Sequence, residues 1–346
     1  MYPRTGMSRA LRLLAFGCCL LILAACRRYE EFTLPPPGGT PEPVTWQWTV
    51  VKEPVIAHGQ ESDWDGVDAL NPSVLIFKNE LLSYYSGFDG KTWHTGLATS
   101  ADGLKWTKQG RILSPDPATW EGSYIAANGH IIYSAGRFLY WYQAGPKGRT
   151  QIGLAQSADG REFTKLPHPV LETGPYGSWD EVSIGDPYVI QIGDYYYLYY
   201  LGQDRARRQR LGVARSRDGI EWTKLRSNPV MEIGEPGSFD EQGLGEPAVW
   251  QSHGSYWMIY TGRDRRERRR MGLARSTDGI RWERQNLVIA GEESWNSHVV
   301  CDPTVEVKGN VVRVWFGGGN AASPDENLHG QIGVGMLSAV YAKDVR

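Results

Sequence analysis

The sequence has little cysteine and little excess charge. Three of its four cysteines, Cys18, Cys19 and Cys26, lie in the first 26 positions, which leaves Cys301 alone in the body of the chain. No disulfide can therefore form within that body, even in an oxidising compartment. The formal net charge of -2 provides no positive field for a polyanion, so we expect no nucleic-acid partner. The seven histidines show no ligand spacing, and we expect no transition-metal cofactor.

Long apolar runs are also scarce, and the one that stands out lies near the N-terminus. Residues 13–25 follow three arginines and are too few for a membrane-spanning helix, as in a signal peptide. The run ends in Leu23-Ala-Ala-Cys26, which resembles the bacterial lipobox. This resemblance implies that Cys26 is lipidated and anchors the protein to a bacterial membrane, with Arg27 favouring the outer membrane, facing the periplasm or the cell surface. A plain signal peptide cleaved nearby is the alternative.

The segment after the signal peptide is rich in proline and glycine. Residues 27–43 include Pro35-Pro-Pro-Gly-Gly-Thr-Pro, which is typical of an extended tether. No comparable linker interrupts residues 44–346. We therefore predict a signal peptide over residues 1–26, a tether over residues 27–43 and one domain over residues 44–346.

Glycine and aromatic residues, by contrast, are abundant, as in short strands joined by tight turns. A motif of the form Gly-x-Ala-x-Ser-x-Asp-Gly recurs every 57 to 61 residues, and a decayed fifth copy ends the series. The copies begin at Gly96, Gly153, Gly212, Gly272 and Gly333. This period suits one four-stranded propeller blade per repeat, and Asp-Gly between apolar runs indicates a hairpin. The predicted fold is all-β, a five-bladed β-propeller.

The last repeat lacks an outer strand, and the N-terminal segment can supply one. Residues 48–56 have the pattern of the outer strands found in the other repeats. We expect this strand to complete the last blade and to close the ring, since closure removes an exposed sheet edge.

One polar residue recurs where each innermost strand begins, close to the expected axis. These residues are Asn71, Asn128, Asp186, Glu246 and Asp302. Three carboxyl groups near one axis would shift one another's pKa values and separate into an acid and a base. The alternative to a functional site is a structural role, in which the acid-Pro and Asn-Pro steps only initiate turns before the strands. A structural Ca²⁺ on the axis is compatible with these residues but is not established by them.

With this repeat and these axial residues, the chain resembles the five-bladed propeller glycosidases. It is most like glycoside hydrolase family 43, with families 32 and 130 as relatives in shape. The resemblance implies that Glu246 is the general acid and that Asp186 tunes its pKa. It also places the catalytic base at Asn71, where an amide cannot take a proton from water. This sequence therefore departs from the family's pattern at the base.

Three replacements for the missing base remain open. Asp68 lies in the same loop as Asn71, and Asp302 lies in the fifth blade. Alternatively, phosphate is the nucleophile, as in family 130, which would require cationic ligands. Arg205, Arg263 and His298 are the candidates for that role. In each case we expect Asn71 and Asn128 to contact the substrate.

The functional prediction is a glycoside hydrolase that acts on a poly- or oligosaccharide as a monomer. A non-catalytic glycan-binding surface lipoprotein and a family 130-like phosphorylase are the alternatives. Two arginine-rich runs, residues 205–210 and 263–270, fall between second and third strands and are expected to be hairpin tips. They need no function there, but guanidinium groups on the site face would suit an acidic or sulfated sugar.

Overall fold

The computed structural model describes residues 28–341. The predicted signal peptide and the lipidation of Cys26 therefore lie outside the described residues. Within residues 28–341 the chain is all-β apart from one 3-10 turn, η1 (Ser294–Asn296), which confirms the predicted class. No helix in this range is long and apolar enough to cross a membrane.

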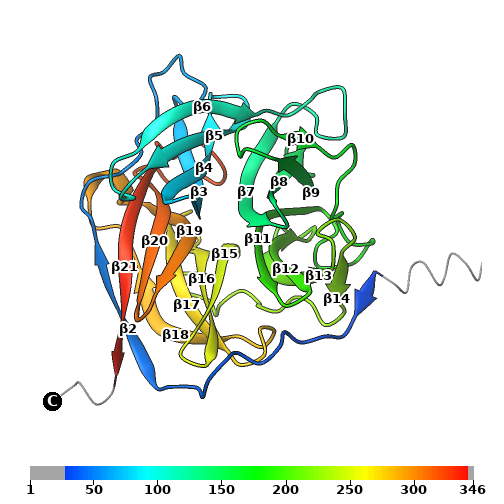
Figure 1. Ribbon diagram of the computed structural model, residues 1–346, viewed down its shortest axis with the longest axis vertical. Helices are drawn as coiled ribbons and strands as arrows, with labels where there is room; N and C mark the ends of the chain where they lie inside the picture. Colours follow the sequence, from blue (N-terminus) through cyan, green and yellow to red (C-terminus); the bar gives the residue numbers. More distant parts are fainter. Residues whose placement is uncertain (1–27, 342–346) are drawn as a thin grey trace, which may run out of the picture.

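The strands follow one another as five antiparallel units of four (Figure 1). The first is β3 (Asp68–Phe77), β4 (Glu80–Phe88), β5 (Trp93–Ser100) and β6 (Thr107–Leu113), and the second is β7 (Ile125–Ser134), β8 (Arg137–Gly145), β9 (Gln151–Ser157) and β10 (Thr164–Lys165). The third is β11 (Ser183–Ile192), β12 (Tyr195–Gln203), β13 (Gln209–Ser216) and β14 (Thr223–Leu225), and the fourth is β15 (Gly243–Ser252), β16 (Ser255–Arg263), β17 (Arg269–Ser276) and β18 (Glu283–Ile289). The fifth is β19 (Val299–Lys308), β20 (Val311–Gly319), β21 (Gln331–Tyr341) and β2 (Val44–Val50).

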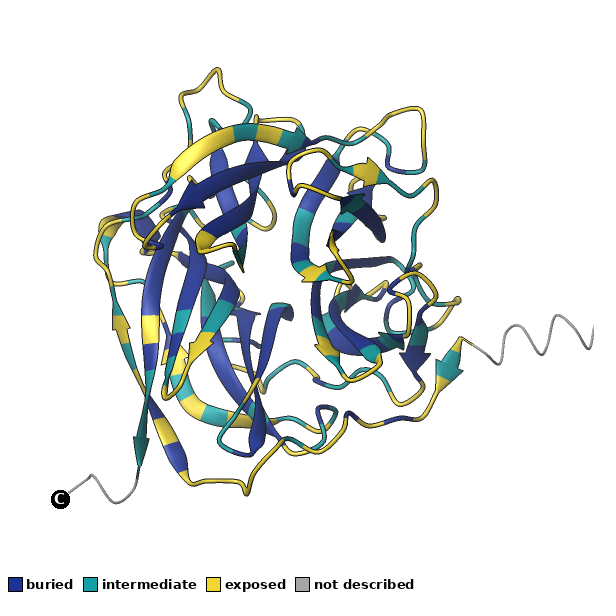
Figure 2. Cartoon of the chain, in the orientation of Figure 1, coloured by how far each residue is buried: buried dark blue, intermediate teal, exposed yellow. Residues whose placement is uncertain are grey.

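The first strand of each unit lies beside the first strand of the next, and β19 of the fifth unit lies beside β3 of the first. Figure 1 shows the units arranged around a common centre. The N-terminal strand β2 pairs antiparallel with β21, as the sequence pattern predicts, although it begins four residues earlier than expected, at Val44. Inner strands are mostly buried, whereas the outermost strands β6 and β18 carry many exposed residues (Figure 2).

The repeated Ser-x-Asp-Gly motif makes a turn that fastens neighbouring units together. In the first unit, the Ser100 hydroxyl accepts hydrogen bonds from the backbone N–H groups of Asp102 and Gly103. Gly103 has a φ of 78°, which favours glycine. Its carbonyl accepts a hydrogen bond from Trp315 Nε1 of the fifth unit. The same link joins later units through Tyr84 to Gly160, Trp141 to Gly219 and Tyr199 to Gly279.

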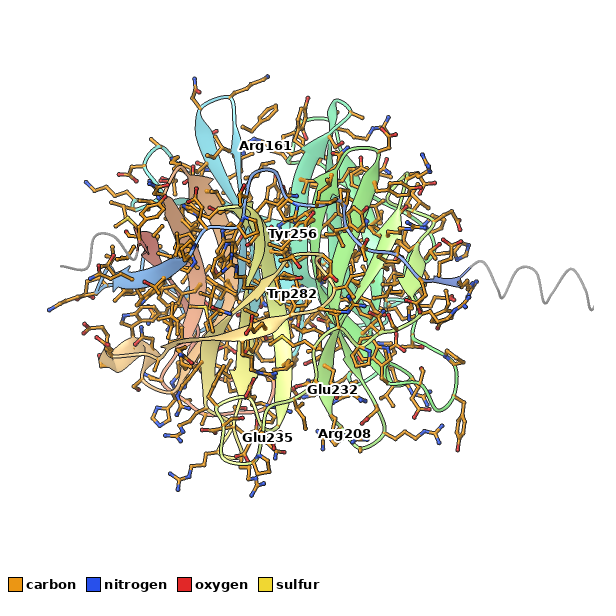
Figure 3. The ribbon with its side chains drawn as sticks, turned by 90° about the horizontal axis from the view of Figure 1, so that it is seen from below. Arg161, Arg208, Glu232, Glu235, Tyr256 and Trp282 are labelled. Carbon is orange, nitrogen blue, oxygen red and sulfur yellow. The ribbon has the colours of Figure 1, made fainter. Side chains whose placement is uncertain are left out.

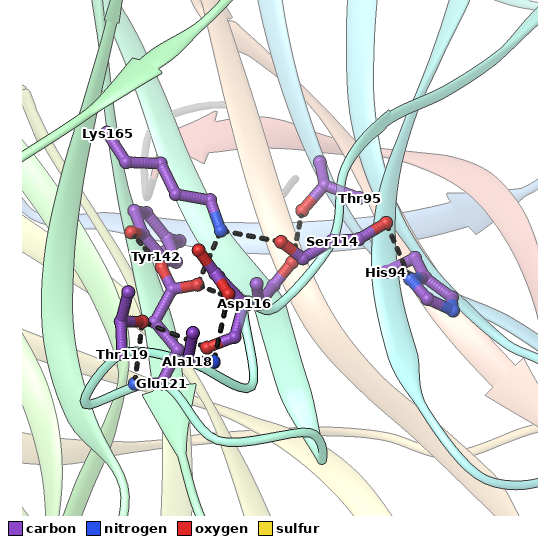
Figure 4. A network of polar contacts seen from close by, with 10 residues as sticks. His94, Thr95, Ser114, Asp116, Ala118, Thr119, Glu121, Tyr142 and Lys165 are labelled. Atoms are coloured by element: carbon purple, nitrogen blue, oxygen red, sulfur yellow. Dashed lines mark hydrogen bonds and ion pairs between the residues drawn. The ribbon is translucent and has the colours of Figure 1, made fainter.

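A buried acid stands in the loop before the first strand of the first four units. In the second unit, Glu121 accepts hydrogen bonds from Tyr142 Oη and Lys165 Nζ (Figure 4). The tyrosine follows the acid by 20 or 21 positions and the cation by 43 or 44 in every case. The other three sets are Asp65, Tyr85 and Lys108; Asp180, Tyr200 and Lys224; and Asp240, Tyr260 and Arg284. Each set ties the loop to the second and fourth strands of its unit.

The described part of the segment predicted as an extended tether lies against the sheets. Residues 28–43 pack against the third and fourth units, where β1 (Tyr29–Glu30) pairs in parallel with β14. Phe32 and Leu34 are buried in the hydrophobic core between those units, at 8% and 2% exposure. The burial of these two apolar side chains favours packing of the segment onto the two units, although Leu34 is followed directly by the run Pro35-Pro-Pro.

Candidate active site

The five axial residues share an unusual backbone conformation. Each lies in a bulge of the first strand of its unit, where the pairing register with the second strand shifts. Their φ values are 48° for Asn71, Asn128 and Asp186, 50° for Glu246 and 54° for Asp302. A left-handed conformation outside glycine costs on the order of 1 kcal/mol per residue and often marks a functional site. Five such residues in register therefore point to a common role at the centre.

Three of these residues form an arc of acids on consecutive units. The backbone N–H of Asp302 donates to Glu246 Oε2 at 3.4 Å, and the backbone N–H of Asn71 donates to Asp302 Oδ2 at 3.2 Å. Cys301 Sγ donates to the same Asp302 oxygen at 3.0 Å. On the other side, Asn128 Nδ2 donates to Asp186 Oδ1 at 3.5 Å. Each acid is thus turned along the ring toward its neighbour.

Burial, and to a smaller extent the charge of a neighbouring acid, raises the pKa values of two of the three acids. Burial and, second, the negative charge of Glu246 raise the pKa of Asp186 from 3.8 to about 8. The same two causes, in the same order, hold the pKa of Asp302 well above its ordinary value. The raised pKa values therefore fall on Asp186 and Asp302, whereas the resemblance to family 43 places the general acid at Glu246.

A cavity of about 270 Å³ opens above this arc. Its lining includes all five axial residues together with Trp93, Gln143, Lys147, Arg207, Arg263, Arg269 and Asp325. Figure 3 places Arg208, at the tip of the β12–β13 hairpin, on one face and Arg161, beside the Asp-Gly turn of the second unit, on the opposite face. The hairpin-tip prediction is confirmed, since residues 204–208 and 264–268 connect second to third strands.

Three sequence-predicted site residues lie outside this cavity lining. Asp68 is fully buried, and its carboxylate accepts hydrogen bonds from the backbone N–H groups of Asn327, Leu328 and Gly330. Arg205 pairs with Glu181 and stacks on the Tyr176 ring. The His298 ring contacts Ser297. The prediction of Asp68 as a base is therefore corrected: its oxygens are occupied by the backbone of a loop.

The loop that Asp68 holds connects β20 to β21 and reaches over the cavity. Arg269 Nη2 donates to the Ser323 and Pro324 carbonyls on one side. On the other side, Glu326 pairs with Lys147 and accepts a hydrogen bond from Tyr124 Oη. Asp68 is thus a positioning residue for the loop over the site.

The cavity lining also contains one cation that the sequence analysis missed, Lys147. Arg207 and Arg269 line it too and belong to the two arginine-rich runs expected on the site face, although only Arg263 was named there as a single ligand. The signal was available in the register: Arg263 and Arg269 are the last and first residues of adjacent strands, and such ends meet at the central face. The fixed distance of Arg263 and Arg269 from the repeat motif would therefore have placed both residues at the central face.

Three of the described residues lie close enough together to hold a metal ion, but their chemistry argues against one. Glu246, Cys301 and Asp302 bring ligand atoms within 4.8 Å of one another. However, Ca²⁺ prefers oxygen ligands, and burial raises the pKa of the Cys301 thiol well above its ordinary value, so that it keeps its proton. The charge of Arg269 beside the group also opposes a cation. We assign no metal to it.

A cavity lined by several carboxyl groups on an all-β frame is the arrangement of a carbohydrate-active enzyme, and comparisons with known proteins give the same class. A glycosyl hydrolase from Bacteroides ovatus has this fold, with a TM-score of 0.68 at 16% identity, covering 90% of this chain and 97% of that one. The chain belongs to the family described as the glycosyl hydrolases family 32 N-terminal domain, whose sequence model matches residues 75–232 and 130–316. The protein is therefore a glycosidase by class.

Two curated relatives are similar in sequence. An uncharacterized protein of Mycobacterium tuberculosis (strain ATCC 25618 / H37Rv) is 28% identical over 236 residues, which is 62% of this chain and 75% of that protein. A 1,2-beta-oligomannan phosphorylase of Thermoanaerobacter sp. (strain X514) is 30% identical over 130 residues, 35% of this chain and 43% of that protein. The expected superfamily is confirmed, and the matching sequence model is that of family 32 rather than family 43.

Proposed function

We propose that the protein cleaves a glycosidic bond of an oligo- or polysaccharide in the central cavity of a closed five-bladed propeller. The ring is supported by the cyclic contacts of the first strands and by the backbone hydrogen bond from Ala69 in the first unit to the Gly330 carbonyl in the fifth. A closed ring brings Asp186, Glu246 and Asp302 to one place although they come from three units.

Asp186 is the proton donor in this proposal, because it lines the same cavity as Glu246, and burial, followed by the charge of Glu246, raises its pKa to about 8. A general acid works best when its pKa lies near the operating pH, because it is then protonated and still gives up its proton readily. The carboxylate of Glu246 stabilises the positive charge that develops on the sugar ring in the transition state. These roles exchange those implied by the resemblance to family 43.

Asp302 does not fit the role of a base that activates water opposite Glu246. The two carboxyl groups bring oxygens within 4.8 Å of each other, whereas inverting hydrolysis needs a separation of roughly 6.5 to 9.5 Å to accommodate water. Asp302 also accepts hydrogen bonds from Cys301 and Asn71. We assign Asp302 to positioning Glu246, whose Oε2 accepts a hydrogen bond from the Asp302 backbone N–H.

The proposal predicts a characteristic pH profile. Activity on a panel of aryl glycosides and oligosaccharides should be retained at neutral pH and fall as the pH rises through about 8, because Asp186 then loses the proton it must donate. Initial rates between pH 5 and pH 10 measure this. A rate that keeps rising through this range would contradict the assignment of Asp186.

Phosphorolysis is the second candidate, favoured by the cations Arg207, Arg263 and Arg269 around the cavity. The similarity to a 1,2-beta-oligomannan phosphorylase gives it further support. The same assays run with and without inorganic phosphate separate the two reactions, since only phosphorolysis yields a sugar 1-phosphate. A protein that binds the glycans without turning them over would instead be the non-catalytic lipoprotein.

The sequence before residue 28 supports a further part of the proposal, a lipid anchor on Cys26 in a bacterial membrane. We expect the wild-type protein in the membrane fraction of a bacterial host and a Cys26→Ser variant in the soluble fraction, because a diacyl anchor needs the thiol. Labelling with radioactive palmitate measures the modification directly. Equal labelling of both proteins would contradict the anchor at Cys26.

A further inference from the structure

The central cavity is closed at the axis of the ring. The space on the other side of the axial residues is lined by the residues that follow them, which include Pro72, Pro187, Pro247 and Pro303, and it holds only about 30 Å³. A volume of this size has room for a water molecule or two but not for a sugar. A glycan therefore cannot thread through the ring, and it must enter and leave on the side of the larger cavity.

The wall of this cavity runs around the whole ring. Every unit contributes lining residues, which include, in chain order, Trp93, Gln143, Gln203, Arg263 and Asp325. The enclosed volume of about 270 Å³ is small beside the roughly 300 to 1,000 Å³ of ordinary ligand pockets. The cavity therefore suits one sugar unit over the acids rather than a chain that extends on both sides of it.

Beside the first unit, part of the wall is a loop that the fifth unit supplies. This bridging loop, residues 320–330, connects β20 to β21. Its Leu328 is fully buried in one cluster with Trp93 of the first unit and Ile125 of the second. Asp68 of the first unit also holds the loop, because its carboxylate accepts hydrogen bonds from three of the loop's backbone N–H groups. The loop is thus fixed where it passes the first unit.

The tip of the bridging loop is fastened to the second unit. Glu326 accepts a hydrogen bond from Tyr124 Oη at 3.0 Å and pairs with Lys147. The Lys147 ammonium group also lies 5.4 Å from the centre of the Tyr124 ring, so these three side chains form one latch. The loop therefore spans from the fifth unit past the first to the second, and it closes the cavity along that side.

We propose that the enzyme removes single sugar units from the non-reducing end of a glycan, and that the bridging loop imposes this by preventing a chain from lying across the first unit. Cleavage takes place at the anomeric carbon of the ring over the acids. Because the cavity is closed at the axis and walled around, that ring is the last of its chain, and the leaving group points out of the cavity mouth.

The chemical step itself is that of the proposed function, on which this inference rests. The glycosidic C–O bond breaks, its oxygen leaves with the proton of Asp186, and water supplies the hydroxyl group of the released sugar. The second proton of that water restores the protonated Asp186. The inference adds which part of the substrate the cavity accepts.

The order in which products appear tests this inference. The probes are β-1,2-linked mannohexaose, chosen after the phosphorylase relative, and the linear hexasaccharide of the best sugar in the glycoside panel. Each carries a fluorophore at its reducing end, and chromatography separates the labelled fragments at early times. The labelled pentasaccharide should exceed all shorter fragments by about tenfold or more. A benzylidene group on the terminal sugar at the non-reducing end should lower the rate by about a hundredfold or more, because that sugar no longer enters the cavity.

Two changes in the bridging loop test its role. The backbone N–H of Ala321 donates to the Leu328 carbonyl at 3.3 Å, so a two-residue Asn-Gly turn can replace residues 322–327. This shortened loop should raise the share of short labelled fragments by about tenfold, because a chain can then lie across the first unit. Glu326→Ala removes only the latch and should shift the products in the same direction. Glu235→Gln, outside the cavity lining, is the control and should keep the wild-type order of products.

Three outcomes would overturn the inference. Wild-type enzyme that yields short labelled fragments from the start, or that cleaves the blocked hexasaccharide at an undiminished rate, does not act at chain ends. A shortened loop that folds, as its melting temperature shows, and keeps the wild-type order of products has no part in the selection. If the shortened loop does not fold, Glu326→Ala decides by the same measurement.

Failure of this inference is distinguishable from failure of the proposed function. An enzyme that cleaves glycans internally keeps the function and loses the selection of chain ends. A protein with no turnover loses the function, and binding then decides: a cavity for chain ends still requires that the free hexasaccharide quench the fluorescence of Trp93, which lines the cavity, and that the blocked one does not.

Discussion

Turnover of the Asp186→Asn and Glu246→Gln variants is expected to fall by about 10²- to 10⁴-fold, the usual contribution of a positioned acid or of a charge that stabilises the transition state. Asparagine cannot donate the proton that Asp186 holds at neutral pH, and glutamine cannot carry the negative charge of Glu246. Steady-state kinetics on the best substrate from the glycoside panel measure kcat for each variant. The pH dependence of the residual activity should also be lost in Asp186→Asn.

Unfolding of the Asp186→Asn variant would also abolish its activity, but the raised pKa of Asp186 predicts that this variant is more stable than wild type at alkaline pH. Because that pKa is raised from 3.8 to about 8, the folded state binds this proton more tightly than the unfolded state. The resulting stability is complete below about pH 4 and is lost as the pH rises through about 8. Asp186→Asn should therefore melt at a higher temperature than wild type at pH 8 to 9. A change at Glu235, an exposed acid outside the cavity lining (Figure 3), is the control: Glu235→Gln should retain full activity. Full activity in Asp186→Asn as well would remove Asp186 from the mechanism.

The sequence allowed the units and the axial residues to be predicted because both repeat. The Ser-x-Asp-Gly turn requires a glycine with positive φ and a hydroxyl beside it, so its spacing is visible without coordinates. Asp186, Glu246 and Asp302 stand at one place in their units, and that regularity alone brings them together. Local chemistry repeated at a fixed period was enough for these predictions.

Features that break the repeat were not predictable in the same way. Asp68 looked like a free carboxylate near Asn71, but a loop some 260 positions later supplies its hydrogen-bond donors. The segment with Pro35 has the composition of a linker, although Phe32 and Leu34 are buried in the hydrophobic cluster formed by two units. Both outcomes depend on long-range contacts, which local composition does not encode.

The second large effect is expected at a buried ion pair far from the cavity. Asp180→Asn should lower the free energy of unfolding by about 3 to 5 kcal/mol, because it leaves the buried ammonium group of Lys224 without its counter-charge. Asp180 accepts hydrogen bonds from Lys224 Nζ at 2.5 Å and Tyr200 Oη at 3.1 Å, and both charged side chains are almost fully buried. Burial already lowers the pKa of Lys224, and Asp180 opposes that shift. Urea unfolding followed by tryptophan fluorescence measures the loss.

The neighbouring position provides a matched control for this change. Glu181 pairs with Arg205, whose side chain is 56% exposed, and accepts a hydrogen bond from the backbone N–H of Gly177. Because glutamine keeps an acceptor oxygen for that N–H and only an exposed partner loses its counter-charge, Glu181→Gln should cost about 1 kcal/mol or less. The fifth unit lacks this ion pair. Asn296 stands at the position of the acid and Phe316 at that of the tyrosine, and the ring of Trp295 stacks on Phe316. The double variant Asp180→Asn, Lys224→Met copies that neutral solution and should recover much of the lost stability. If the double variant is less stable than Asp180→Asn alone, the cost lies in packing around Lys224 and not in its unpaired charge.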